Sequence, residues 1–87
     1  MPRTVKISIS YCAECGYEPQ TLALADALMR EFGLSLSALE LIPWHDGTFD
    51  VSIDGRLVHS MARDGGFPRS EDVVRAVRVA LAAKAVG

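Results

Sequence analysis

The sequence lacks any long apolar run and carries little net charge. No apolar stretch approaches the roughly 18 residues that a membrane-spanning helix needs, and the N-terminus lacks the basic and then apolar order of a secretory signal peptide. The formal charge is −2, and the nine Lys and Arg residues are scattered along the chain, so they form no basic stripe that attracts phosphate. We therefore expect a cytoplasmic protein that binds neither membrane nor nucleic acid.

Cysteine is also scarce. The chain has only Cys12 and Cys15, and both lie in one Cys-x-x-Cys motif. Two cysteines are too few for the disulfide framework of a small secreted domain. In a reducing compartment such a pair indicates catalysis, redox sensing or metal binding.

Internal repeats, low-complexity segments and linkers are absent as well, so we expect the 87 residues to form one domain, residues 1–87. Of these residues 49% are apolar and 23% are charged, which is the composition of an ordinary globular protein. A domain of this size buries only about 60% of the surface of its unfolded chain, so its stability should be modest.

Hydrophobic periodicity predicts a βαβ unit in the first half of the chain. Residues 4–10 alternate between apolar and polar side chains, as a strand with one buried face does. An apolar stripe at helical spacing follows, formed by Leu22, Ala25, Leu28, Met29 and Phe32. Pro19 suits the first turn of this helix, and Gly33 suits its end. Residues 36–42 read as a second strand, which a helical crossover makes parallel to the first.

The second half predicts a hairpin and a closing helix. Residues 49–53 alternate, Asp54 and Gly55 offer a tight turn, and residues 56–61 form the return strand. Ser70 is a suitable N-cap for the last helix. Its apolar stripe consists of Val73, Val74, Val77 and Leu81.

The register of the hairpin stays open at this point. A two-residue turn places Val58 opposite Val51 and exposes Leu57 and Met61. A bulged three-residue turn instead places Leu57, His59 and Met61 on the buried face.

The polar side of the first strand indicates how the helices are arranged. A central strand covered on both faces would be apolar throughout, whereas Lys6, Ser8 and Ser10 are polar. The predicted fold class is therefore α/β, with the order βαβββα and a four-stranded mixed sheet that carries two helices on one face.

The position of the cysteine pair favours redox chemistry. We expect the sulfurs of Cys12 and Cys15 to meet across the first turn of a helix, where unpaired N–H groups and the helix dipole lower a thiol pKa that is ordinarily about 8.5. The spacing lets the second sulfur resolve a mixed disulfide formed by the first. Glu14, between the two, opposes formation of the thiolate.

Two other functions remain as alternatives. One is a protein-binding module, without turnover, whose surface is switched by the disulfide. The other is a metal site, for which His45 and His59 would be the further donors, but their spacing fits no common zinc finger. A loop position for His45 and a strand position for His59 account for both residues without a metal.

The predicted topology places three connections at one end of the sheet: the cysteine loop, residues 43–47 and residues 62–69. Ligands of open α/β sheets bind at such an end. We therefore expect a substrate-binding surface for a thiol-bearing peptide or protein, formed by Trp44, His45, Arg63 and Phe67. The alternative is that Trp44 and Phe67 fill gaps beneath their loops.

Four short motifs together resemble the selenoprotein W-like (Rdx) family over nearly the whole chain. They are Tyr11-Cys12-x-x-Cys15-Gly16-Tyr17, Phe49-x-Val51, Gly55-x-Leu57-Val58-His59-Ser60 and Gly65-Gly66-Phe67. The resemblance implies a thioredoxin-like fold without a helix between the second and third strands. It also identifies the chain as a cysteine-containing member, because selenocysteine in this family matches Cys15.

The resemblance leaves the order of the two sulfurs open. The family pattern makes Cys15 the attacking group, whereas analogy with thioredoxin assigns that role to Cys12. The proline that precedes the third strand of thioredoxin has no counterpart directly before Phe49, since Pro43 is too early.

The resemblance further implies redox control linked to glutathione or thioredoxin. We expect no bound cofactor, with glutathione as a co-substrate and a thiol- or disulfide-bearing protein as the other partner. An unpaired edge strand, or exposed Leu57 and Met61, would support a homodimer.

Overall fold

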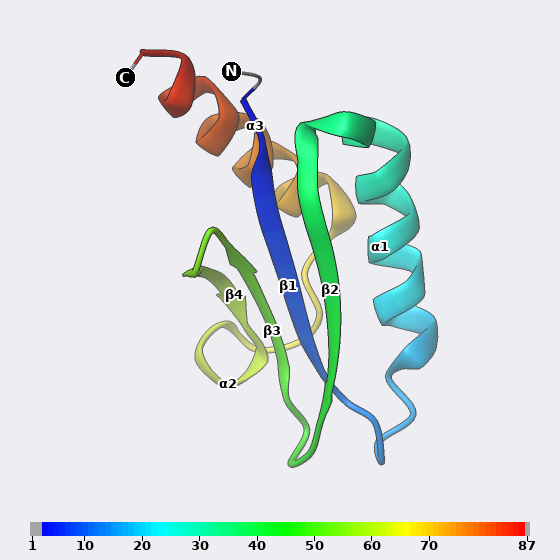
Figure 1. The fold of residues 1–87 in the computed structure, drawn as a ribbon. Coiled ribbons are helices and arrows are strands. Elements are labelled where there is room, and N and C mark those ends of the chain that lie inside the picture. Colours follow the sequence, from blue (N-terminus) through cyan, green and yellow to red (C-terminus); the bar gives the residue numbers. More distant parts are fainter. Residues whose placement is uncertain (1–2, 87) are drawn as a thin grey trace.

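The central sheet has four strands in the order β2-β1-β3-β4 (Figure 1). A computed structural model describes residues 3–86 of the chain. Its strands are β1 (Val5–Cys12), β2 (Leu36–Trp44), β3 (Phe49–Ile53) and β4 (Arg56–Ser60). β1 runs parallel to β2 and antiparallel to β3, which pairs antiparallel with β4. The prediction of a four-stranded mixed sheet is confirmed.

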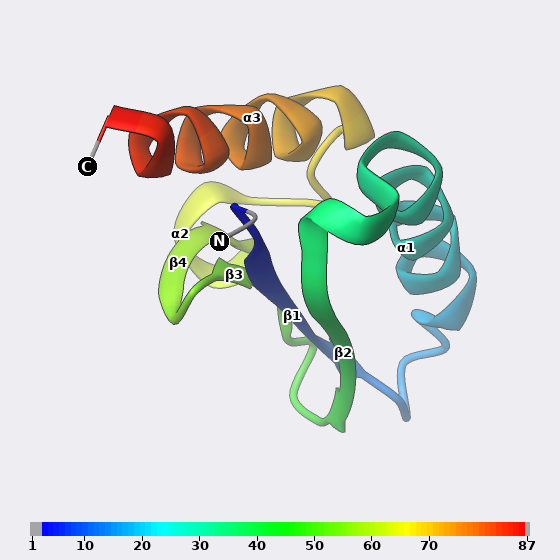
Figure 2. The ribbon, with the colours of Figure 1, turned by 45° about the horizontal axis from the view of Figure 1, so that its top comes forward.

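The two long helices, α1 (Glu18–Phe32) and α3 (Ser70–Val86), pack on one face of this sheet (Figure 2). The core lies between them and the sheet, and its buried members come from β1, β3 and both helices: Val5, Ile7, Ile9, Leu24, Leu28, Phe49, Val51, Ile53, Val73 and Val77. On the other face Ser8 donates a hydrogen bond to Glu40 (2.8 Å), and Lys6 pairs with the same carboxylate (3.4 Å). The alternation in β1 therefore predicted the one-sided arrangement correctly. None of the helices within residues 3–86 is long and apolar enough to cross a membrane.

The buried face of α1 differs from the predicted stripe. Leu22 and Met29 are 60% and 55% exposed, whereas Thr21, Leu24 and Leu28 are buried. Thr21 tolerates burial because its hydroxyl donates a hydrogen bond to the carbonyl oxygen of Tyr17 (2.9 Å). The polar Thr21 thus lies on the inner face of α1, and the prediction that Leu22 and Met29 belong to its buried stripe was wrong.

The hairpin combines the two registers that the sequence left open. Asp54 and Gly55 form a two-residue turn with positive φ values of 52° and 83°, and Ser52 pairs with Leu57. A bulge then leaves Val58 unpaired, so that His59 pairs with Val51. Leu57 is 41% exposed, as the two-residue turn requires.

A short helix that the sequence did not predict follows β4. The return strand ends at Ser60 instead of reaching residue 61, and α2 (Met61–Asp64) occupies the start of the expected loop. Its N-terminus is capped in both directions, because the Ser60 hydroxyl accepts from the Arg63 N–H (3.4 Å) and the Asp64 carboxylate accepts from the Ser60 N–H (3.0 Å). α2 and the 3-10 turn η1 (Gly33–Ser35) add to the predicted order.

Candidate functional site

Cys12 and Cys15 lie where β1 turns towards α1. Cys12 is the last residue of β1, and Cys15 lies in the turn of residues 13–16, before α1 begins at Glu18. Gly16 has a φ of +76°, which interrupts the helical backbone and prevents α1 from extending back to the cysteines. The expectation that the sulfurs meet across the first helical turn was therefore wrong. Since the field of a helix end falls off within one turn, it contributes less at Cys15 than we expected.

The two cysteines form a disulfide, with an S–S distance of 2.11 Å and a Cα–Cα distance of 5.3 Å. Their exposure differs sharply, because Cys12 is fully buried and Cys15 is exposed. The bond therefore has an inner and an outer residue. Solvent reaches the pair on the side of Cys15.

Backbone hydrogen bonds fix the cysteine turn to the connection between β2 and β3. The N–H of Cys12 donates to the carbonyl oxygen of Thr48 (2.7 Å), and the N–H of Ala13 donates to that of Trp44 (3.0 Å). β2 runs two residues further than predicted and ends at Trp44, which brings this carbonyl to the turn. Figure 1 shows both connections at the same end of the sheet.

Two carboxylates lie on the cysteine turn and on the connection that faces it. The Glu14 carboxylate accepts a hydrogen bond from the N–H of Asp46 (3.3 Å), and the Asp46 carboxylate contacts Nδ1 of His45 (2.7 Å). Both acidic side chains are exposed. Glu14 is the acidic residue between the two cysteines in the chain, and a nearby negative charge disfavours a thiolate.

An aromatic cluster packs behind the turn. The Phe67 ring lies edge-on to Tyr17 (4.9 Å between centroids) and to Phe49 (5.0 Å). The Tyr17 hydroxyl donates to Sδ of Met61 (3.7 Å). This cluster ties the residue two positions after Cys15 to β3 and α2, and so holds the start of α1 in place.

The structure brings only some of the predicted surface residues to the cysteine turn. Trp44 is 55% exposed and stacks on the His45 ring (4.7 Å), and both lie on the segment to which the turn is bound. Phe67 reaches the site only through Tyr17. The guanidinium of Arg63 instead binds the Asp64 carboxylate (2.8 Å) and the carbonyl oxygen of Val58 (3.3 Å).

Sequence reasoning missed the contributions of Asp46 and Thr48. Thr48 acts through its backbone carbonyl, which every residue has, so no sequence signal distinguishes it. Asp46 and Gly47 both have positive φ, 60° and 71°, and an Asp-Gly pair is a recognisable turn signal. Residues 43–47 were expected at this end of the sheet, but the tight turn that Asp46 and Gly47 form within them was not identified.

Metal ligands do not gather in the part of the chain that the structure describes. Within residues 3–86 no three His, Cys, Asp or Glu side chains come close enough together to hold a metal ion. His59 binds the carbonyl oxygen of Gly66 through Nε2 (2.9 Å), and its Nδ1 lies 3.6 Å from the Asp64 carboxylate. This histidine therefore links β4 to the segment after α2.

Sequence comparisons identify a family and several proteins that this chain resembles. The sequence pattern of the Rdx family matches residues 6–79. Selenoprotein W of Mus musculus is 36% identical over 81 residues, which cover 87% of this chain and 92% of that protein. Migration and invasion enhancer 1 of Mus musculus is 38% identical over 75 residues, 85% of this chain, but the chain spans only 63% of its length.

Two solved structures share the fold. A selenoprotein W-related protein from Vibrio cholerae superposes with a TM-score of 0.87 at 24% identity, covering 91% of this chain and 99% of that one. A protein from Bordetella parapertussis gives a TM-score of 0.83 at 29% identity, covering 87% and 96%. The arrangement of strands and helices is thus the one that these structures have.

Proposed function

This chain belongs to the Rdx family and has a thioredoxin-like fold, and on that premise we propose that it is a thiol–disulfide redox protein acting through Cys12 and Cys15. The observation that carries the proposal is a disulfide with one buried and one exposed residue. This asymmetry gives an outside thiol or disulfide access to one member of the pair. The buried member, Cys12, would then resolve the mixed disulfide within the protein.

The proposed cycle needs only sulfur exchange. In the reduced protein the Cys15 thiolate attacks a substrate disulfide, forms a mixed disulfide and releases one substrate thiolate. Cys12 then loses its proton and attacks Sγ of Cys15, which forms the Cys12–Cys15 disulfide and releases the second substrate thiolate. Two electrons and two protons pass to the substrate. Two external thiols, or one external dithiol, then reduce the Cys12–Cys15 disulfide and are themselves oxidised to a disulfide.

Exposure favours Cys15 as the outer nucleophile over the order suggested by thioredoxin. Full burial of Cys12 prevents a large disulfide substrate from approaching its sulfur in line. The same burial suits a resolving group, because its target on Cys15 is already within bonding distance.

The partners that fit this chemistry are a thiol that donates electrons and a disulfide that accepts them. Glutathione or a thioredoxin-type dithiol protein would supply the electrons, and a disulfide-bearing protein would accept them. No bound cofactor is needed, since the two sulfurs carry both electrons. The cytosol is the compartment we propose, because a reducing thiol pool keeps such a pair cycling.

Trapping of mixed disulfides tests this assignment. In Cys12→Ser the resolving sulfur is missing, so adducts on Cys15 should accumulate when the protein is mixed with oxidised glutathione or a cell extract. In the matched variant Cys15→Ser the remaining thiol is buried, and adducts should be at least tenfold scarcer. Intact mass measurement gives both yields. Equal yields, or more adduct on Cys15→Ser, would reject Cys15 as the outer nucleophile.

A further inference from the structure

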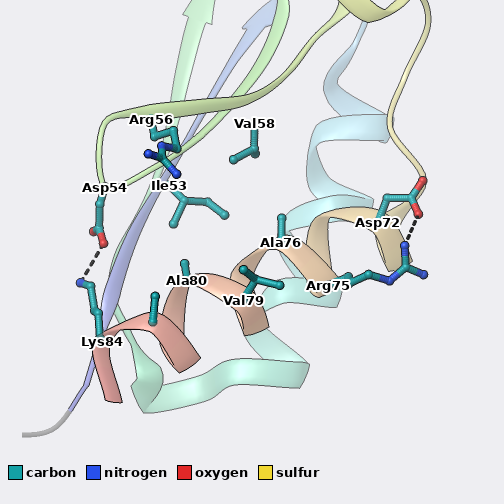
Figure 3. A pocket seen from close by; sticks show the side chains of 11 residues that line it. Ile53, Asp54, Arg56, Val58, Asp72, Arg75, Ala76, Val79, Ala80 and Lys84 are labelled. Atoms are coloured by element: carbon teal, nitrogen blue, oxygen red, sulfur yellow. Dashed lines mark hydrogen bonds and ion pairs between the residues drawn. The ribbon is translucent and has the colours of Figure 1, made fainter. Parts of the chain in front are cut away.

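A hollow of about 660 Å³ separates the β3–β4 hairpin from α3, away from the cysteine pair (Figure 3). Ile53 and Val58 line it from the hairpin. Its α3 side is formed by small and apolar residues, namely Ala76, Val79, Ala80 and Ala83. In Figure 3 the side chains of the two elements face each other across the space.

The hollow exists because α3 presents short side chains there. Ala76, Ala80 and Ala83 follow one another at spacings of four and three residues, so they lie on one helix face. Their methyl groups cannot fill the distance to β4. Val79, at the edge of the same face, is 65% exposed, which means that a well-placed aliphatic side chain is left in water.

The charges at the rim are unevenly paired. Lys84 binds the Asp54 carboxylate (2.7 Å) at the hairpin end, and Arg75 binds the Asp72 carboxylate (3.2 Å) at the opposite end. Arg56 also lines the hollow beside Asp54. Within residues 3–86 its guanidinium has no hydrogen bond or ion pair to another residue. Among the described residues that line the hairpin end, two are cations and one is a carboxylate, which leaves one positive charge without a partner there.

We propose that this groove binds a free long-chain carboxylate, such as a fatty acid. The carboxylate of this ligand accepts hydrogen bonds from two guanidinium N–H groups of Arg56. Its hydrocarbon chain lies between Val58 and the alanines of α3. A volume of about 660 Å³ lies within the range of small-molecule sites. This ligand class is separate from the redox function proposed above.

The lining favours a hydrocarbon chain over a peptide. A bound peptide must satisfy its backbone N–H and C=O groups, but between the charged residues at its two ends the hollow is lined by Ile, Val and Ala side chains, which offer no partners. A hydrocarbon chain makes no such demand and leaves one anionic head for one unpaired cation.

The groove is also long enough for an extended hydrocarbon chain. A second hollow of about 220 Å³ shares Val58, Asp72 and Ala76 with the first, and continues to Phe67. From Asp72 to Lys84 the helix alone covers about 18 Å, so the apolar track accommodates an extended chain longer than a short organic acid.

Binding of laurate, below the concentration at which it forms micelles, tests the proposal. We expect saturable binding at one site by calorimetry, with amide shifts in nuclear magnetic resonance spectra concentrated on Val58, Ala80 and Ala83. Lauryl alcohol lacks the charge and butyrate lacks the chain, so both should bind at least tenfold more weakly. Arg56→Gln should weaken laurate binding about tenfold, whereas the exposed control Arg30→Gln should not.

Filling the groove gives a second, independent readout. Ala83→Phe places a ring in the groove and should abolish laurate binding. Ala82→Phe, at the neighbouring exposed position of α3 that does not line the hollow, should leave it intact. The proposal is overturned if laurate does not saturate, if lauryl alcohol binds equally well, or if an acidic amphipathic peptide binds the groove and laurate does not.

Discussion

At the scale of single residues, the two cysteines of the site differ in exposure, and an acidic residue lies between them in the chain. Cys12 is buried at the end of a strand, and Cys15 stands outside in a turn. Glu14 lies between them in the chain, and its carboxylate is held at the site by the N–H of Asp46. The neighbour in the chain is thus an anion, whereas the strongly acidic cysteines of other redox proteins have cationic neighbours.

Neutralising Glu14 should make the outer thiol more reactive. In Glu14→Gln one negative charge beside Cys15 is lost, so more of the reduced thiol is ionised at neutral pH. We expect the rate of alkylation by iodoacetamide at low ionic strength to rise about two- to threefold, and added salt should shrink the difference. Glu31→Gln, at the far end of α1, is the matched control. An unchanged rate in Glu14→Gln would show that this carboxylate does not act on the thiol.

At the scale of elements, alternation predicted more than helical stripes did. The strands followed from residues such as Val5, Ile7 and Ile9, because a period of two leaves little choice of buried face. The face of α1 was misplaced since Leu22 is apolar yet exposed, and Thr21 is polar yet buried. α2 was missed because its caps pair Ser60 with Asp64, one residue beyond the usual capping spacing.

The cap of α2 makes part of the stability depend on pH. The hydrogen bond from Arg63 and then the Ser60 N–H hold the pKa of the Asp64 carboxyl well below its usual range. A carboxylate whose pKa is depressed by folding stabilises the fold above its unfolded pKa of about 3.9. That contribution is lost as the pH falls through the folded pKa.

Asp64→Asn should therefore flatten the acid side of the stability profile. Urea unfolding between about pH 5 and pH 2 should show a steeper loss in the wild type than in the variant. Part of the loss of stability at low pH should persist in the variant, because the pKa of Asp54 is also lowered, by Lys84 and by the Lys6 N–H. Asp26→Asn removes an exposed carboxylate from α1 as the control. Equal slopes in the wild type and Asp64→Asn would contradict the capping role.

At the scale of the whole molecule, the sheet order and the one-sided helices could be predicted, but the packing of the site could not. A helical crossover and a tight hairpin restrict the topology to few choices. In contrast, the cysteine turn is held by backbone hydrogen bonds that its N–H groups donate to the carbonyl oxygens of Trp44 and Thr48. Backbone groups are the same in every residue, so only the folded chain shows which of them meet.

These backbone contacts also bear on how the molecule survives reduction. The disulfide closes a loop of only four residues, Cys12 to Cys15, and such a short loop constrains little of the unfolded chain. The backbone hydrogen bonds that hold the turn to the sheet do not involve the sulfur atoms. We therefore expect the reduced protein to keep its fold and to return to the disulfide reversibly.

Equilibration in graded glutathione buffers, with free thiols counted by alkylation and mass measurement, tests whether Cys12 and Cys15 form a reversible redox pair. We predict one reversible two-electron transition between the Cys12–Cys15 disulfide and the dithiol, in which the ratio of the two forms changes tenfold for about 30 mV. Its midpoint should lie between about −200 and −320 mV, the span of cytosolic thiol couples. A pair that stays in one state across that span, or that unfolds on reduction, would contradict this prediction.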